Sequence, residues 1–368
     1  MVGGAGALSS VARERAIRAR RLLAVGLLVV VAGTVVVLIA TAHQHSPSVP
    51  HAQRSAKTGG GAGGSPTSGS PGAGAAPRHT APAEFAVGVR VLSFTDPTRT
   101  IQLPNGTTAP RTLVTIVRYP ALGAAGSGEA RNAPPATADG PFPLVLFGHG
   151  FAVTPDPYSP LLRAWTRAGY VVAAPLFPLE NASAPGGPNE SDLSNQPADM
   201  SFLISRMLAA GSTPGGPLAG MVDAGRIAVS GHSDGGDTAL AAAYDPRYRD
   251  PRIGAAVILA GAEIPGLGSF PFPAGGPPLL AVQGTADPIN LPALTDAFFA
   301  EAHRPKFLLR LPGAEHLPPY TSEQPQLQTV TRVSLAFLDG YLRKRPGAVA
   351  RMASLGKVAG TAELVAEP

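Results

Sequence analysis

Cysteine is absent from this sequence of 368 residues, and its absence narrows the possible chemistry. Without a thiol, the chain can form no disulfide, use no cysteine nucleophile and hold no cysteine-bound zinc. An oxidising compartment is not excluded by this observation. Any reaction must therefore use oxygen or nitrogen groups.

The larger part of the chain also lacks an excess of charge of either sign. The formal net charge is +5, but residues 1–21 contain five Arg and one Glu, and residues 43–84 contain two Arg, one Lys and one Glu. From Phe85 onward, 21 Lys and Arg face 22 Asp and Glu. With its charges balanced, this part of the chain lacks the excess of basic residues expected of a nucleic-acid-binding domain. We therefore predict no nucleic-acid partner.

Residues 22–42 contain no charged side chain and follow the arginine-rich residues 1–21. As a helix they would span roughly 31 Å, which matches the hydrocarbon core of a bilayer. Because positive charge stays on the cytoplasmic side, we expect a single-pass signal anchor with the rest of the chain outside the cytoplasm. A cleaved signal peptide is the alternative, since Ala40-Thr41-Ala42 has the form of a cleavage site. The length of the apolar run favours the anchor.

The next stretch, residues 43–84, is rich in Gly, Pro, Ser and Ala and has few large apolar side chains. We expect a disordered linker, because such a segment cannot bury enough apolar surface to offset the entropy of ordering. Its histidines, His43, His45 and His51, are interpreted as solvated side chains rather than metal ligands. Residues 85–368 then form one domain, with a core over 85–345 and a C-terminal extension over 346–368.

In residues 85–345, strand patterns alternate with helix patterns. The segments FAVGVRVLSF and RTLVTIVRY predict an antiparallel pair at a sheet edge. After Pro141, six short apolar runs are typical of parallel strands covered on both faces, and five helical segments lie between or after them. The sequence therefore predicts an α/β domain with a doubly wound, mostly parallel sheet, whose ligands bind beyond the carboxyl ends of the strands.

A candidate nucleophile, Ser233, lies in GHSDGG between a strand pattern and a helix pattern. A serine nucleophile needs a histidine to accept its proton and a carboxylate to orient that histidine. Asp287 is the next acid at the end of a strand pattern, and His316 follows the strand after that. This gives the order Ser, acid, His of the α/β-hydrolases. Taken singly, Asp287 could stabilise a turn and His316 could be a loop histidine. Glu315 is the less favoured orienting acid.

An oxyanion hole would complete such a site. The backbone amide of Asp234 provides one donor, and the Phe151 amide in the glycine-rich turn VLFGHGFA is the second candidate. The Asp234 carboxylate is expected to point away from the hole, toward the amides of the first helical turn. His149 and His232 are interpreted as packing residues of the two turns, although either remains an alternative to His316.

The motifs FGHGF, GHSDGG, GTADP and GAEH, with the segments FAVGVRVLSFTDP and NQPADMSFLISRM, resemble the serine esterase branch of the α/β-hydrolase superfamily. This branch includes chlorophyllase-like, platelet-activating-factor-acetylhydrolase-like and cutinase-like polyester hydrolases, and the resemblance covers about residues 85–345. It implies an α/β-hydrolase fold, a triad of Ser233, Asp287 and His316, and an oxyanion hole formed by the amides of Phe151 and Asp234.

Two departures from the polyester hydrolases concern the substrate. Asp234 stands where those enzymes usually have Met, and the segment LAGAEIPGLGSFPFP stands where they have an aromatic residue. A polyester substrate is therefore not favoured. Phe270 and Phe272 could line an acyl pocket or pack a loop over the core, while Trp165, the only Trp, is expected to pack a helix against the sheet.

The sequence thus predicts a membrane-tethered serine hydrolase that cleaves a small-molecule or lipid-like carboxylic ester through an acyl-enzyme, with no metal or organic cofactor. An acyltransferase that uses the same triad is one alternative. A non-catalytic α/β-hydrolase-fold binding protein is another, which is less favoured because all three triad residues are present. The physiological ester and the oligomeric state are not indicated.

Overall fold

The computed structural model describes residues 84–264, 267 and 271–368, which belong to one compact unit. The predicted basic segment, membrane anchor and linker, apart from Glu84, lie outside these residues. Within the described part, no helix combines the length and the hydrophobicity needed to cross a membrane.

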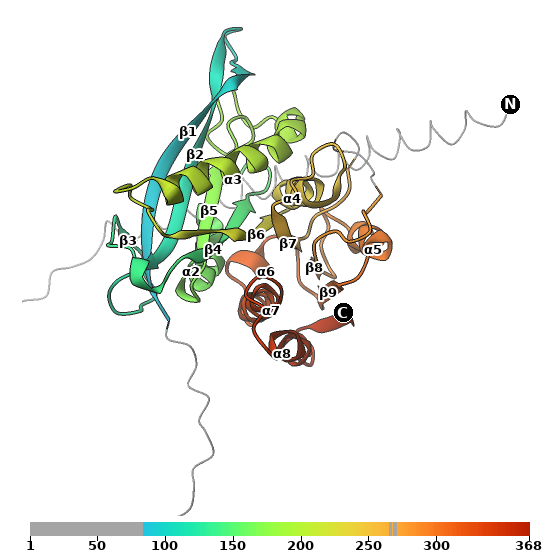
Figure 1. The fold of residues 1–368 in the computed structure, drawn as a ribbon. Helices are drawn as coiled ribbons and strands as arrows, with labels where there is room; N and C mark the ends of the chain where they lie inside the picture. The colour runs from blue at the N-terminus through green and yellow to red at the C-terminus, as the bar shows by residue number, and fades with distance from the viewer. Residues whose placement is uncertain (1–83, 265–266, 268–270) are drawn as a thin grey trace, which may run out of the picture. The chain divides into compact units, whose positions relative to one another are not determined.

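A mixed β-sheet forms the centre of the domain (Figure 1). In the described part of the chain it has ten strands in the order β10-β9-β8-β7-β6-β4-β5-β2-β1-β3. Strands β5, β4, β6, β7, β8 and β9 run parallel, while β2 pairs antiparallel with both β1 and β5. The strands are β1 (Ala86–Gln102), β2 (Thr108–Ala121), β3 (Ala130–Arg131), β4 (Phe142–Gly148), β5 (Val171–Leu176), β6 (Val222–His232), β7 (Ile253–Leu259), β8 (Leu279–Gly284), β9 (Lys306–Leu311) and β10 (Glu363–Glu367).

Helices cover both faces of the sheet (Figure 1). Met200, Leu240 and Phe298 of α3, α4 and α5 are buried in one apolar cluster, and Trp165 and Phe337 of α2 and α7 are buried in the other. The expected doubly wound, mostly parallel α/β fold is confirmed. The helices are α2 (Ser159–Arg167), α3 (Gln196–Ser212), α4 (Asp234–Tyr244), α5 (Pro292–Glu301), α6 (Pro318–Thr321), α7 (Gln326–Tyr341) and α8 (Ala348–Leu355), with short 3-10 helices η1 (Thr137–Asp139), η2 (Asp156–Tyr158) and η3 (Glu190–Asn195).

Trp165 illustrates how one helix is fixed to the sheet. Its side chain is fully buried, its ring centroid lies 6.2 Å from that of Phe147, and its indole N–H donates to Ser334 Oγ at 2.9 Å. The indole thus buries a large apolar surface while its polar atom is satisfied. The expected packing of Trp165 against the sheet is confirmed.

The C-terminal extension contributes more to the sheet than the sequence indicates. Its strand β10 pairs antiparallel with β9, and Met352 of α8 is buried in the same cluster as α2 and α7. The strand escaped prediction because ELVAE is short and half polar, so its strand conformation depends on pairing with β9.

Candidate active site

Ser233 occupies a sharp turn between β6 and α4. Its backbone has φ 55° and ψ −126°, in a region that a residue with a side chain rarely adopts. Glycines permit the turn: a methyl group added at Gly231 would overlap the Gly235 backbone, and one added at Gly235 would overlap the Gly148 carbonyl. The sequence GHSDGG therefore raises the serine side chain at the carboxyl end of the sheet and brings α4 close to β4.

Ser233, His316 and Asp287 lie in one hydrogen-bonded line, and all three are buried. The distance from Ser233 Oγ to His316 Nε2 is 2.9 Å, and from His316 Nδ1 to Asp287 Oδ2 it is 2.7 Å. With the Nδ1 proton donated to the carboxylate, Nε2 is left to accept the serine proton. The structure thus brings the three predicted residues together in the order that a nucleophile, a base and an orienting acid require.

Asp287 is held in place by its own turn after β8. Its Oδ1 accepts the amides of Ile289 and Asn290 at 2.8 and 2.9 Å, and its Oδ2 also accepts the Gln283 side-chain amide at 3.1 Å. These donors fix the carboxylate so that Oδ2 faces His316. Glu315, the less favoured acid, is exposed, and the structure pairs His316 with Asp287 instead.

The glycine-rich turn after β4 lies against the serine. A methyl group at Gly150 would come within 3.1 Å of Ser233 Cβ. The next residue, Phe151, has no hydrogen-bond partner for its amide among the described residues. Asp234 begins α4 directly after Ser233, so both amides predicted for the oxyanion hole lie beside Ser233. Their function as donors stays a prediction.

A chain of hydrogen bonds joins this turn to the His316 loop. The Gly150 amide donates to the Tyr158 hydroxyl at 3.4 Å, the hydroxyl lies 2.8 Å from His232 Nδ1, and His232 Nε2 lies 2.8 Å from the His316 carbonyl. A carbonyl only accepts, so Nε2 carries the proton and Nδ1 accepts from Tyr158. Burial and the neighbouring His316 lower the pKa of His232 well below its ordinary value, which keeps the ring neutral.

His149 joins the same turn to the end of β5. Its Nε2 accepts the Phe177 amide at 3.0 Å, and Nδ1 lies 2.8 Å from the Gly150 carbonyl. Burial lowers the pKa of His149 to about 4, so this ring is also neutral near pH 7. Neither His149 nor His232 contacts Ser233 Oγ, as expected for packing residues.

Three site residues were missed in the sequence. Gln283 and Tyr158 carry no signal, because only the fold brings them to Asp287 and His232. Glu180 did carry one: it follows the apolar run VVAAPLF of β5, at the same end of the sheet as Ser233. An acid at the carboxyl end of a buried strand is a candidate site residue.

The segment between β7 and β8 is described only in part. Phe270 lies outside the described residues. Phe272 is buried, with its ring centroid 4.8 Å from that of Tyr244, which supports a core-covering function for this residue. Among the described residues, no group of three His, Asp or Glu side chains is placed to hold a metal ion.

Comparison with known proteins agrees with this fold. The chlorophyllase family model matches residues 133–259. Among solved structures, a ferulic acid esterase from Streptomyces cinnamoneus matches with a TM-score of 0.52 and 22% sequence identity, over 73% of this chain and 93% of that one. No curated protein gives a significant match. The structural match shows that the two proteins share a fold, and the family model relates part of this chain to the chlorophyllases.

Proposed function

We propose that this protein hydrolyses carboxylic esters through an acyl-enzyme formed on Ser233, with His316 as general base and Asp287 as the orienting acid. The observation that supports this proposal best is the unbroken line of hydrogen bonds from Ser233 Oγ through His316 to Asp287 Oδ2. His316 accepts the serine proton as Oγ attacks the ester carbonyl, then donates it to the leaving alcohol. Water attacks the acyl-enzyme in the same way and releases the acid.

The tetrahedral intermediate carries negative charge on the former carbonyl oxygen. The amides of Phe151 and Asp234 are the proposed donors to this oxygen, since both lie in turns against Ser233. Each such donor contributes a factor of about 10²–10³ in kcat in well-studied serine hydrolases. No metal or organic cofactor is required for these steps.

The substrate proposed is a small-molecule or lipid-like ester. Support comes from the chlorophyllase family model and the ferulic acid esterase match, which both point to carboxylic esters. A transferase using the same acyl-enzyme would differ only in the acceptor that attacks it. Product analysis with added alcohols distinguishes hydrolysis from transfer.

The proposed location is the outer side of a membrane, with residues 22–42 as the anchor and residues 43–84 as a linker. The support is the uncharged run behind five arginines in the sequence. Secretion after cleavage near Ala42 is the alternative.

The decisive experiment is labelling with a fluorophosphonate probe, read by intact mass, followed by a panel of esters with graded acyl length. We expect one probe adduct on wild-type protein, on Ser233 by peptide mapping. A protein that neither labels nor hydrolyses any ester would contradict the proposal.

A further inference from the structure

A second acid, Glu180, lies beside the nucleophile turn and has no function in the proposed reaction. It follows β5 and its side chain is 0% exposed. Its backbone carbonyl accepts the Ala152 amide at 2.9 Å, and Ala152 directly follows Phe151, a proposed oxyanion donor. The Ala152 backbone has φ 57°, so this turn is held in a conformation that its neighbours must maintain.

The Glu180 carboxyl group faces the carboxyl group of Asp234, the residue after the nucleophile. Asp234 is 3% exposed, and its carboxyl group is close enough to Glu180 to raise the pKa of Glu180. Among the described residues, neither Glu180 carboxyl oxygen has a further hydrogen-bond partner. Two neighbouring carboxylates repel each other in a buried site, and a proton on one of them removes the repulsion and supplies a donor.

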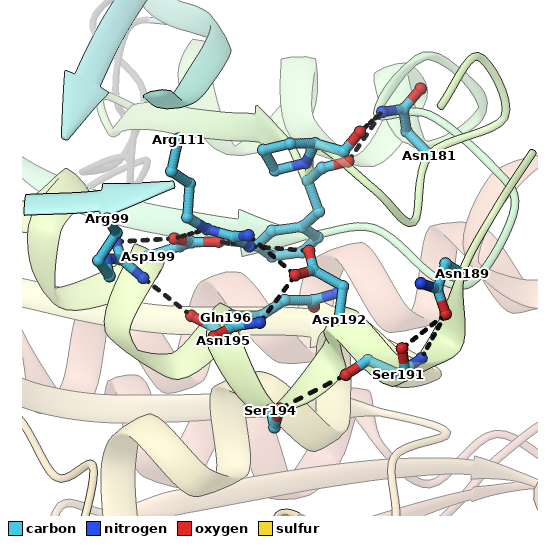
Figure 2. Close-up of polar contacts among 12 residues, drawn as sticks. Arg99, Arg111, Asn181, Asn189, Ser191, Asp192, Ser194, Asn195, Gln196 and Asp199 are labelled. Carbon is cyan, nitrogen blue, oxygen red and sulfur yellow. Dashed lines mark hydrogen bonds and ion pairs between the residues drawn. The ribbon is translucent and has the colours of Figure 1, made fainter. Parts of the chain in front are cut away.

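The chain around Glu180 is fixed from several sides, as Figure 2 shows for the residues that follow it. Asn181 donates to the carbonyls of Phe177 and Pro178 at 2.8 and 3.4 Å, and the buried Arg111 pairs with Asp192 at 2.8 Å. Glu180 therefore cannot easily move away from Asp234 to reach water.

The titratable groups around Glu180 and Asp234 disfavour a negative charge on Glu180 in addition to one on Asp234. Besides Asp234, the acids that act on Glu180 are Asp192 and Glu190 of η3. With burial as the largest cause, they raise the pKa of Glu180 well above its ordinary value. The other titratable side chains near Asp234 are His149 and Tyr158, which are neutral near pH 7.

We infer that Glu180 and Asp234 form a buried acid pair that holds one proton. The pair positions the turn that carries Phe151, the oxyanion turn, against the turn that carries Ser233, the nucleophile turn. This inference rests on the proposed function and adds a positioning residue to the same site. With the proton present, Glu180 donates to the Asp234 carboxylate and keeps that charge behind the turn. When the proton leaves to solvent at high pH, the two carboxylates repel each other and the turns separate.

The test compares the pH dependence of kcat/KM and of thermal unfolding in wild type, Glu180→Gln and Glu180→Ala. Glutamine keeps a donor to Asp234 without a proton to lose, so Glu180→Gln should retain activity within about threefold at pH 7 and lack the decline at high pH. Glu180→Ala removes the donor, and kcat should fall about tenfold to a hundredfold because the hole is misplaced.

The unfolding measurement does not depend on activity. Folded Glu180 keeps a proton that the unfolded chain loses above about pH 4.3, so its contribution to stability is complete below that pH and decreases as pH rises toward the folded pKa. The Tm of wild type should fall relative to Glu180→Gln by about 2 °C per pH unit in this range.

Glu301→Gln is the matched control, since Glu301 is exposed at the end of α5 and does not act on Glu180, so both pH profiles should stay close to wild type. Identical pH profiles of wild type and Glu180→Gln, or normal kcat in Glu180→Ala, would overturn the acid pair. If the wild type hydrolyses no ester and takes no probe, the proposed function fails, and the pair is then decided by the Tm comparison alone.

Discussion

Ser233 has an unusual backbone conformation because it lies in the sharp turn between β6 and α4. Its φ of 55° places Oγ where His316 Nε2 can reach it at 2.9 Å. In the α/β-hydrolases, a serine held in such a turn can face the ester on one side and its histidine on the other. The hydroxyl itself makes no helix cap, so its removal should affect chemistry more than folding.

We therefore predict that Ser233→Ala lowers ester turnover by about 10⁴-fold or more, because no acyl-enzyme can form. Probe labelling should disappear while the circular dichroism spectrum and Tm remain close to wild type. Ser230→Ala is the matched control, because Ser230 lies on β6 and its hydroxyl has no hydrogen-bond partner among the described residues. Substantial turnover by purified Ser233→Ala protein would refute the nucleophile assignment.

The Tyr158 hydroxyl connects Gly150 to His232 by hydrogen bonds. Removing this hydroxyl tests whether the connection positions the site. In Tyr158→Phe, His232 Nδ1 loses its donor in a fully buried site. We predict a loss of about 1–3 kcal/mol in unfolding free energy, the cost of an unsatisfied buried polar group. kcat should fall about tenfold with little change in KM, since His316 is less firmly placed.

Urea unfolding and steady-state kinetics check this prediction. Tyr341→Phe removes the same atom from a half-buried tyrosine on α7, away from the site, and should change neither quantity. Wild-type kcat and stability in Tyr158→Phe would show that the chain of hydrogen bonds has no positioning function.

At the scale of elements, a buried ionic network joins the β1–β2 hairpin to η3 and α3 (Figure 2). Arg111 of β2 binds Asp192 and Asp199 in bidentate pairs with distances of 2.6–2.8 Å, and all three side chains are buried. The network anchors the segment that carries Glu180. Loss of Arg111 would leave the buried Asp192 without its cation and Asp199 with Arg99 alone.

Arg111→Met should accordingly lower the free energy of unfolding by about 3–5 kcal/mol. The partly exposed pair of Arg226 and Asp223 provides the comparison, and Arg226→Met should cost no more than about 1 kcal/mol. Both values come from the same urea titration. If both variants lost the same free energy of unfolding, the buried ion pairs of Arg111 would contribute no more to stability than the partly exposed pair of Arg226.

At the scale of the whole molecule, the buried neutral histidines make the free energy of unfolding decrease as the pH falls. The pKa of His149 is lowered to about 4, so on unfolding below pH 6.5 this ring takes up a proton that the folded state excludes. Its contribution to stability is present above pH 6.5 and is lost as pH falls through 4, by about 3 kcal/mol in total. His232, whose pKa is also lowered by burial, acts in the same direction.

We predict that His149→Gln flattens the fall in Tm between pH 6.5 and 4.5, because glutamine does not titrate and its side-chain oxygen can still accept the Phe177 amide. His303, which is exposed, supplies the control substitution His303→Gln, and this variant should follow the wild-type curve. The same slope in His149→Gln and wild type would refute the link between this ring and acid stability.

The membrane proposal also concerns the whole chain. Full-length protein should sediment with membranes and resist release by high salt, because burial of an apolar helix is not weakened by screening. Mass spectrometry of the N-terminus then decides between the anchor and cleavage, since a mature protein starting at His43 would show cleavage. Release by salt of an uncleaved chain would contradict both.

The layered α/β fold and the order of its main elements could be predicted from the sequence, because apolar runs and helix periodicity are local properties of the chain. It also singled out Ser233, Asp287 and His316, since each follows its own strand pattern at the same end of the sheet. Their functions remain predictions, but their meeting is now observed in the structure.

The groups that support those residues could not be predicted from the sequence, because they come together only through tertiary packing. Tyr158 and His232 are 74 residues apart, and Arg111 and Asp199 are 88 apart, so no local pattern announces either contact. Strand β10 exists because β9 offers it a free edge, and Glu180 meets Asp234 because β5 and β6 both flank β4. Such pairings depend on the packing of distant segments, which composition and periodicity do not encode.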